Sequence, residues 1–292
     1  MVRAAIRRGD GLPNGRVWLR SVVRNAQLAL IDSGHLKATS GISKTADGQF
    51  GLETEKAVKT LQAEGKLEPS GVLNRASWTR LEPYLQNVLR DRDARTTAQL
   101  KEFRGDLDWI HEKEGHRGYP YWPQGESGVT LDPGVDLGQA APELVERLYA
   151  PLLTAAQMNA VRQVFGFQGE NANAALKASA VLASIRLSPS QAADLMPYTA
   201  HDYWQRICTR FKALERKKTP PSVQTALLSL AYNRGPGNRY LESLQELLEN
   251  ERWNDAADKI AAMQQNHKLR GIRTRRRDEA ALIRDELEFL AS

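Results

Sequence analysis

The stretch that decides the fold reads DWIHEKEG over residues 108–115 and, after a short gap, YWPQGESGVTLDPGVDLG over residues 121–138. The first part has helical spacing and stops at a glycine, the residue type most common just after a helix. The second part interleaves aromatic and β-branched residues with glycine and proline, which predicts short strands or extended loops. A helix end therefore leads directly into a stretch that is not helical.

Most of the remaining sequence has helical periodicity. In the N-terminal third we expect helices over residues 16–32, 52–64 and 75–85. Asn74 is placed to cap the third of these. Residues 86–105 are polar and charged, which indicates a linker or a helix that connects two units. Beyond the turn-rich stretch we expect helices over residues 139–149, 154–165, 171–184, 188–216, 220–233, 240–250, 253–265 and 271–290.

Composition bounds the class of protein. The chain has 292 residues and 41% hydrophobic content, which predicts about two domains with buried cores. No apolar run approaches the ~20 residues needed to span a bilayer, so we expect no stable membrane insertion. Charged residues interrupt the first ten positions, so the N-terminus lacks the apolar run of a signal peptide. This favours a protein made in a cytoplasm. The single cysteine, Cys208, excludes a disulfide framework and Cys-rich zinc sites, and we expect a core or boundary thiol, no metal and no cofactor.

The net charge of +6 is unevenly distributed. Residues 1–90 contain 14 Lys and Arg against 8 Asp and Glu, whereas residues 91–292 contain 27 of each. A basic module is typical of proteins that meet polyanions such as nucleic acid, acidic polymers or membrane surfaces. A plain solubility bias produces the same excess, so charge alone leaves the partner open.

Glu114 is the candidate general acid. A carboxylate at the C-terminus of a helix feels the negative end of the helix dipole, which disfavours its ionised form. Desolvation against an aromatic-lined cleft disfavours that form further, which suits a general acid in glycoside hydrolysis. The competing interpretation is a solvated glutamate at a helix end, which for an arbitrary Glu-Gly pair is the better one.

A pattern of glycines and apolar residues marks the N-terminal third. It begins with DGQFG at residues 47–51 and continues through Thr54, Ala57-Val58, Leu61-Gln62, Gly65, Leu67, Gly71-Val72, Trp78 and Leu81. Over roughly residues 6–85 this order resembles the small three-helix peptidoglycan-binding domain of many cell-wall hydrolases. The resemblance implies peptidoglycan as the partner and a binding face at Asp47, Gly48, Phe50, Gly51, Thr54 and Gln62. Each residue also has a structural interpretation, because glycines allow tight turns and Trp78 belongs in a core.

The spacing of three polar residues marks the turn-rich stretch. Thr130 stands sixteen residues after Glu114, and Asp136 stands six after Thr130. This arrangement resembles the catalytic opening of the phage-type lysozymes, and SGVTLDPGVDLG at residues 127–138 is closer to their pesticin-like muramidase branch. The resemblance implies a small hairpin, Glu114 as catalytic acid, and Thr130, Asp136 or both positioning water or stabilising an oxocarbenium-like charge.

Two later segments agree with this resemblance. Residues 226–235 read ALLSLAYNRG and residues 271–279 read GIRTRRRDE. Both resemble helices of the phage-type lysozymes, the first with cleft contacts at its end and the second with an arginine that reaches the catalytic glutamate. The substrate-contacting residues that these helices imply are Asn233, Gly235, Arg273 and Arg276.

The hairpin departs from the phage-lysozyme pattern at its second carboxylate. The acidic residue that those enzymes carry before the threonine falls near Gln124, where no Asp stands. Glu126 and Asp132 are nearby carboxylates outside the motif. The second carboxylate is therefore Asp136, or Glu114 acts without one. A separation of roughly 5 Å between two carboxylates implies retention and roughly 6.5–9.5 Å implies inversion, and the sequence leaves both open.

Together these patterns predict a mainly α protein. We expect a three-helix wall-binding domain over residues 1–85, a linker over 86–105, and an α+β lysozyme-like muramidase domain with a short β-hairpin over 106–292. Tyr121 and Trp122 are expected to line the cleft and stack on sugars, with packing under the hairpin as the alternative. We interpret the chain as a monomeric phage endolysin, held in the host cytoplasm until release and then acting on periplasmic peptidoglycan for host cell lysis.

Three alternatives remain. A lytic transglycosylase cleaves the same bond with one glutamate and no water, and the missing hairpin Asp is compatible with that. A non-catalytic wall-binding or tail protein has no need of Glu114 and Thr130. A nucleic-acid-binding protein accounts for the pI of 9.4 and for the arginines of residues 270–277. It does not account for the excess charge at residues 1–90, and we expect no nucleic-acid partner.

Overall fold

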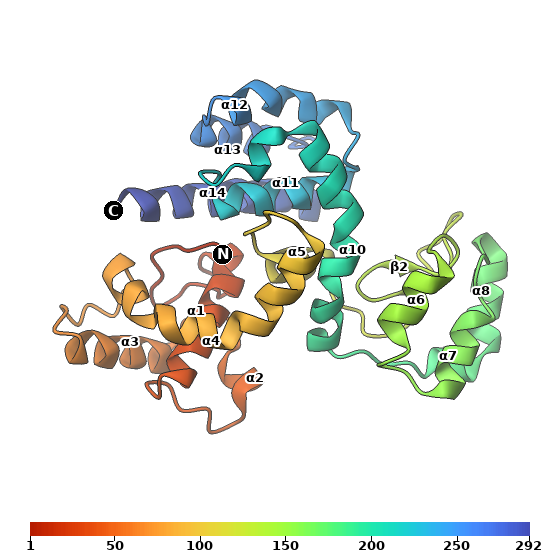
Figure 1. Ribbon diagram of the computed structural model, residues 1–292, viewed down its shortest axis with the longest axis horizontal. Coiled ribbons are helices and arrows are strands. Elements are labelled where there is room, and N and C mark those ends of the chain that lie inside the picture. The colour runs from red at the N-terminus through yellow and green to blue at the C-terminus, as the bar shows by residue number, and fades with distance from the viewer. The chain divides into compact units, whose positions relative to one another are not determined.

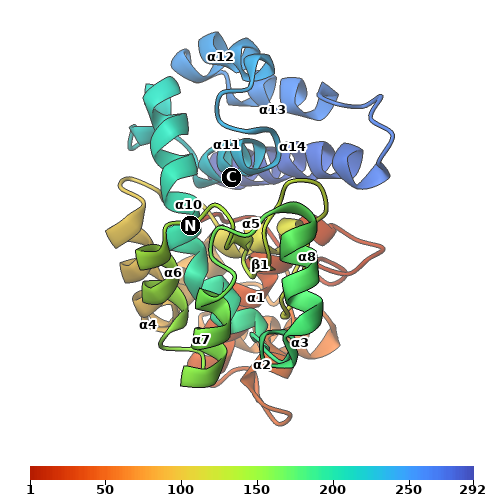
Figure 2. The ribbon, with the colours of Figure 1, turned by 90° about the vertical axis from the view of Figure 1, so that its right-hand side faces the viewer.

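The computed structural model describes residues 1–292 (Figures 1 and 2). Most segments with helical periodicity are helices in it. The sheet is a two-stranded antiparallel hairpin of β1 (Thr130–Leu131) and β2 (Val135–Asp136). The predicted fold class, mainly α with a short β-hairpin, is confirmed. The chain divides into two compact units, residues 1–110 with 202–292 and residues 111–201.

Three helices build the N-terminal part of the first unit: α1 (Arg20–Asp32), α3 (Leu52–Glu64) and α4 (Arg75–Gln99). Two short elements accompany them, the 3-10 helix η1 (Val17–Leu19) and α2 (Ile42–Thr45). α1 packs against α3 and α4 because its apolar stripe faces both. The buried side chains of this core include Leu19, Val22, Val23, Ala26, Leu30, Phe50, Val58, Leu61, Trp78 and Leu81.

Helix α4 begins as predicted and ends later. Asn74 caps it, since its side chain accepts a hydrogen bond from the backbone N–H of Ser77 at 3.1 Å. We expected this helix to end at Leu85, but Leu85 and Leu89 continue the buried stripe and the helix runs to Gln99. Most of the predicted linker is therefore a connecting helix. The domain boundaries 1–85, 86–105 and 106–292 stay a prediction. The two compact units are defined by contacts in space, and one of them combines two separate stretches of the sequence.

Within the first unit, the N-terminal segment is bound to α14 (Arg270–Ala291). Asp285 accepts hydrogen bonds from Arg16 Nη1 at 3.1 Å and from Trp18 Nε1 at 2.7 Å. The adjacent Glu286 is buried and accepts two backbone N–H groups from other parts of the unit. These contacts join the N-terminal helices to the C-terminal helix directly.

The C-terminal part of the first unit is a group of helices around α14. It contains η2 (Lys212–Glu215), α11 (Pro221–Arg234), η3 (Arg239–Leu244), α12 (Gln245–Glu249) and α13 (Trp253–Ala262). Figures 1 and 2 both show α13 between α12 and α14, with α11 beside α14. None of the helices combines the length and hydropathy that crossing a membrane requires.

The second unit places the hairpin among short helices (Figure 1). These are α6 (Pro142–Tyr149), α7 (Ala155–Arg162), α8 (Gly169–Ala178) and α9 (Ala180–Ala183). We expected one helix over 171–184, but Ser179 ends α8 and its side chain accepts a hydrogen bond from the first turn of α9. Hairpin and helices share one core, which includes Val129, Leu131, Val135, Leu137, Val145, Leu148, Tyr149, Met158 and Val161.

Two helices cross the boundary between the units along the chain. α5 (Leu107–Glu114) leads from the first unit into the second, and α10 (Pro189–Arg210) leads back. The helix predicted over 188–216 ends at Arg210, after which η2 continues. Cys208 in α10 is buried, which confirms the expected core or boundary thiol.

Candidate functional site

Glu114 is the last residue of α5, as the Glu-Gly pair predicts. Gly115 ends the helix with a φ of +81°, a conformation that glycine adopts at little cost, and its N–H bonds the carbonyl of His111 at 3.0 Å. Glu114 is exposed, so burial does not supply the desolvation that we considered for it.

Thr130 and Asp136 lie directly opposite each other on the hairpin. They form the first register pair of β1 and β2, with Leu131 and Val135 as the second. Residues that pair directly across antiparallel strands project to the same face, with Cβ atoms about 4.5–5.5 Å apart. The structure therefore brings two of the three predicted catalytic residues together on one face of the hairpin.

The carboxylate of Asp136 also organises the hairpin. Its Oδ1 accepts backbone N–H groups from Gly128 at 2.9 Å and Gly138 at 2.8 Å, and its Oδ2 accepts from Gln139 at 3.3 Å. A Cβ atom at Gly128 would collide with Asp136 Oδ1 and with the backbone of Gly138, so only glycine allows this approach. Oδ1 is bound by two backbone N–H groups of the loop, whereas Oδ2 accepts only the longer hydrogen bond from the side chain of Gln139.

Asp132 is a further carboxylate of the site, which the sequence analysis set aside as outside the motif. It is buried, and its Oδ2 accepts from the backbone N–H of Arg117 at 2.8 Å and of Gly118 at 2.5 Å. His116 Nδ1 lies 2.9 Å from the same oxygen. Asp132 directly follows β1, so these hydrogen bonds hold residues 117–118, just after Glu114, against the end of that strand. The sequence signal was a second acidic residue inside the hairpin, two positions after Thr130.

Tyr121 pairs with Thr130, and several charged residues of the candidate site affect its pKa. Its backbone pairs with Thr130 through two hydrogen bonds of 3.1 and 2.7 Å, so residue 121 extends the hairpin by one bridge. Burial raises the pKa of the Tyr121 phenol, the Arg117 guanidinium 3.9 Å from its ring lowers it, and the charges of Asp132, Glu114 and Asp136 raise it. The three carboxylates therefore all act on one half-buried phenol.

Trp122 has the packing role that we held as its alternative. It is half-buried against the core of the second unit and donates its indole N–H to the carbonyl of Ser127 at 3.0 Å. Gln124, where phage-type lysozymes carry an acid, is exposed with a φ of +83°, and Glu126 is exposed. Among the predicted cleft aromatics, Tyr121 is the one placed beside the carboxylates.

The other predicted substrate contacts belong to the first unit. Asn233 is exposed in the last turn of α11, and Gly235 ends that helix with a φ of +81°. Arg273 donates to the backbone carbonyls of His267 and Lys268. These three contacts with substrate stay a prediction.

Arg276 is fully buried in a charged cluster between α11 and α14. It donates to Glu279 at 2.9 Å, while Arg275 donates to the hydroxyl of Ser229 at 3.0 Å. Ser229 in turn donates to Glu279 at 2.5 Å. Burial raises the pKa of Glu279, and the two arginines lower it. The contact of Arg276 with the catalytic glutamate, implied by the resemblance, stays a prediction.

Two buried glutamines hold the turns of the N-terminal helices. Gln27 accepts the N–H of Gly48 at 2.8 Å and donates to the carbonyl of Gln49 at 3.0 Å. Gln62 repeats the arrangement, accepting the N–H of Gly71 at 2.9 Å and donating to the carbonyl of Val72 at 2.8 Å. Both glycines have a φ of +76°. Gln62 therefore supports a loop, and the fully buried Phe50 supports the core, so neither is placed to touch a ligand.

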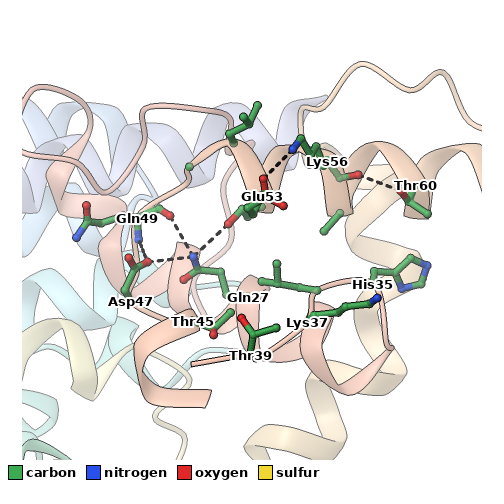
Figure 3. Close-up of a pocket in the computed structure, with 15 residues that line it drawn as sticks. Gln27, His35, Lys37, Thr39, Thr45, Asp47, Gln49, Glu53, Lys56 and Thr60 are labelled. Carbon is green, nitrogen blue, oxygen red and sulfur yellow. Dashed lines mark hydrogen bonds and ion pairs between the residues drawn. The ribbon is translucent and has the colours of Figure 1, made fainter. Parts of the chain in front are cut away.

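A pocket of about 600 Å³ opens beside these turns (Figure 3). Asp47, Gly51 and Thr54 line it, whereas Gly48 and Phe50 are buried next to it. The other lining residues are Gln27, His35, Leu36, Lys37, Thr39, Thr45, Gln49, Leu52, Glu53, Lys56, Ala57 and Thr60. Three of the six residues that we predicted for the wall-binding face thus share one cavity. No group of three or more His, Cys, Asp or Glu is placed to hold a metal ion.

Two family models match the chain. The model described as bacterial toxin homologue of phage lysozyme, C-terminal, matches residues 104–254, which is half of the sequence. The model described as peptidoglycan binding domain matches residues 20–81. No curated protein matches the sequence.

Proposed function

Because the chain belongs to the family of bacterial toxin homologues of phage lysozyme, we propose that it hydrolyses the β-1,4 bond between N-acetylmuramic acid and N-acetylglucosamine. It is a lysozyme-like protein with a peptidoglycan-binding domain ahead of the lysozyme-like part. The bacterial wall is its partner, and glycosidic cleavage is the reaction that lysozymes carry out there.

The observation that carries the proposal is that Thr130 and Asp136 pair across the hairpin that follows the helix ending at Glu114. Thr130 and Asp136 share one face of the hairpin, and the charges of Glu114 and Asp136 both reach the Tyr121 phenol. In the proposed reaction Glu114 protonates the leaving oxygen. Thr130 and Asp136 orient the attacking water or stabilise the positive charge that develops on the sugar.

A lytic transglycosylase is the second candidate, and the geometry of Asp136 favours it specifically. One oxygen of Asp136 is held by two backbone N–H groups, and no acid stands at Gln124. Glu114 is then the only exposed carboxylate of the predicted catalytic set. A transglycosylase needs one carboxylate, because the sugar's own hydroxyl closes the ring in place of water.

Purified peptidoglycan distinguishes these reactions. We expect the wild type to release fragments with reducing ends, and Glu114→Gln to lower kcat about 10²–10⁴-fold, the usual contribution of a general acid. The matched control is Glu126→Gln, the same change at an exposed glutamate of the same segment. Anhydro ends in the mass spectrum would establish the transglycosylase. Full activity of Glu114→Gln would remove Glu114 from the mechanism.

We further propose that the protein is a phage endolysin that lyses its host. The N-terminal domain holds the enzyme at the wall, which raises the local concentration of the lysozyme-like part without new catalytic contacts. Production of the protein inside a bacterium should leave the culture intact until the inner membrane is permeabilised, and then clear it. Clearing without permeabilisation would contradict retention in the cytoplasm.

A further inference from the structure

The pocket between α1 and α3 has a lining unlike that of a typical sugar site. Its volume of about 600 Å³ lies within the usual range of small-ligand pockets, about 300–1,000 Å³. None of its lining residues is Trp, Tyr or Phe, so it offers no aromatic ring on which a sugar would stack. Figure 3 shows instead a polar rim of threonine, acidic and basic side chains.

Asp47 presents an oriented carboxylate to this pocket. Its Oδ1 accepts hydrogen bonds from Gln27 Nε2 at 3.1 Å and from the backbone N–H of Gln49 at 2.8 Å. Gln27 is itself buried and bound to the same turn, so the carboxylate is held in one direction. Its Oδ2 has no hydrogen-bond partner within the chain and is free to accept from a cationic ligand.

Lys37 presents the opposite charge. It is exposed, lines the pocket and makes no hydrogen bond or ion pair. Figure 3 shows Lys37 and Asp47 on opposite sides of the pocket in that view, with Thr39 and Thr45 between them. The remaining charged residues of the pocket are paired, Lys56 with Glu53 at 2.7 Å and His35 with Glu64 at 3.0 Å. The charges left for a ligand are therefore one carboxylate and one ammonium.

We propose that this pocket binds the peptide part of peptidoglycan and not its glycan strand. A stem peptide carries free carboxylates and the ammonium of a diamino acid, which complement Lys37 and Asp47. The glycan strand carries no ammonium, and the carboxyl of its muramic acid is used in the amide bond to the peptide. Charge-assisted hydrogen bonds of this kind are about twice as strong as neutral ones. The proposal rests on the wall-binding role proposed above and names the part of the wall that is recognised.

The test uses the full chain, whole sacculi, and two soluble competitors that an amidase releases from sacculi, namely the glycan strands and the stem peptides. We expect the chain to co-sediment with whole sacculi. The free stem peptide should displace it from them, and the glycan strands should not. Asp47→Asn keeps the acceptor for Gln27 and Gln49 and removes the charge. Together with Lys37→Glu it should weaken binding to sacculi at least about tenfold, as expected for loss of a hydrogen bond to a charged group.

Matched controls separate the pocket from general attraction to an acidic wall. Glu68→Gln and Lys44→Glu make the same charge changes at exposed residues outside the pocket. Equal weakening by Lys44→Glu and Lys37→Glu would overturn the pocket. Displacement by the glycan strands and not by the stem peptide would overturn the peptide as ligand and leave wall binding standing. Failure of the wild type to bind any sacculi would instead overturn the wall-binding role itself.

Discussion

The N-terminal turns and the hairpin turns are both rich in glycine, yet different chemistry holds them. In the N-terminal helices, the amides of Gln27 and Gln62 accept one backbone N–H and donate to one backbone carbonyl. In the hairpin, the carboxylates of Asp132 and Asp136 accept two backbone N–H groups each. An amide satisfies donors and acceptors without charge, whereas a carboxylate satisfies donors only and brings charge with it.

The difference follows the use of each region. The uncharged amides of Gln27 and Gln62 leave the electrostatics of the neighbouring pocket to the exposed Asp47 and Lys37. The carboxylates that hold the hairpin turns, Asp132 and Asp136, also contribute negative charge to the candidate active site. Both raise the pKa of the Tyr121 phenol. We infer that Gln62 serves stability alone and that Gln27 also orients Asp47 at the pocket. Asp132 and Asp136 of the hairpin serve stability and catalysis together.

The largest effect, on the free energy of unfolding, is expected when one of the two glutamines that hold the N-terminal turns is replaced by a charged residue. Gln62→Glu turns a carboxylate oxygen toward the carbonyl of Val72 in a fully buried place. An uncompensated buried charge costs about 3–5 kcal/mol, so urea unfolding at pH 7 should show a loss of that size. The loss should shrink in acid, because the protonated carboxyl donates again. The control is Gln163→Glu at an exposed position. A loss below about 1 kcal/mol at pH 7 would show that the clamp tolerates charge.

Removal of a hairpin clamp should affect catalysis more than folding. Asp132→Ala frees the N–H groups of Arg117 and Gly118 and with them the segment after Glu114. Displacement of a reacting group by about 1 Å costs on the order of 10²-fold, so kcat should fall about 100-fold with little change in KM. Asp132→Asn keeps an acceptor and should recover most of that rate. Equal loss of activity in both variants would mean that the charge of Asp132, and not its clamp, is what the reaction needs.

A third carboxylate, Glu286, is buried as Gln62 is and accepts two backbone N–H groups as Asp132 and Asp136 do. It accepts the N–H of Arg3 at 3.1 Å and of Ser222 at 2.7 Å. Burial raises its pKa, and the hydrogen bonds from Ser222 lower it. With a folded pKa above the unfolded one, its contribution to stability is complete below the ordinary glutamate pKa and is lost as pH rises through the raised value.

Glu286→Gln should therefore remove a pH dependence. Between the two pKa values the wild type should lose up to about 1.4 kcal/mol of stability per pH unit relative to the variant. Denaturant unfolding from pH 4 to 8 measures both slopes. Parallel curves for the two proteins would mean that Glu286 keeps its ordinary pKa in the folded chain.

The smallest effect, on the rate of thiol alkylation, is expected at Cys208, which lies outside both sets of turns. Burial raises its pKa to about 12, so almost no thiolate exists near neutral pH. Alkylation at pH 8 should run at less than about a tenth of the rate of free cysteine, and addition of urea should restore it. Rapid alkylation of the folded protein would show that α10 opens easily.

Much of the site was predictable because its residues are close in sequence. Glu114, Thr130 and Asp136 lie within one short stretch, and a helix end followed by turns leaves few ways to arrange them. Asp132 was not predictable as a clamp, because its partners are backbone N–H groups at residues 117–118, whose direction depends on how the loop folds back. The length of α4 was open for a similar reason, since its second half is polar except for residues that meet a partner helix.

The positions of most helices, the two family patterns and the types of residue in the candidate site could be predicted from the sequence. Periodicity, capping and turn chemistry act over a few residues and can be read along the chain. Tertiary structure alone decided that Gln27 and Gln62 support turns, that Asp47 and Lys37 share a pocket, and that Asp285 joins the N-terminal helices to α14. Those contacts depend on segments that are distant in the chain and meet only when the core has formed.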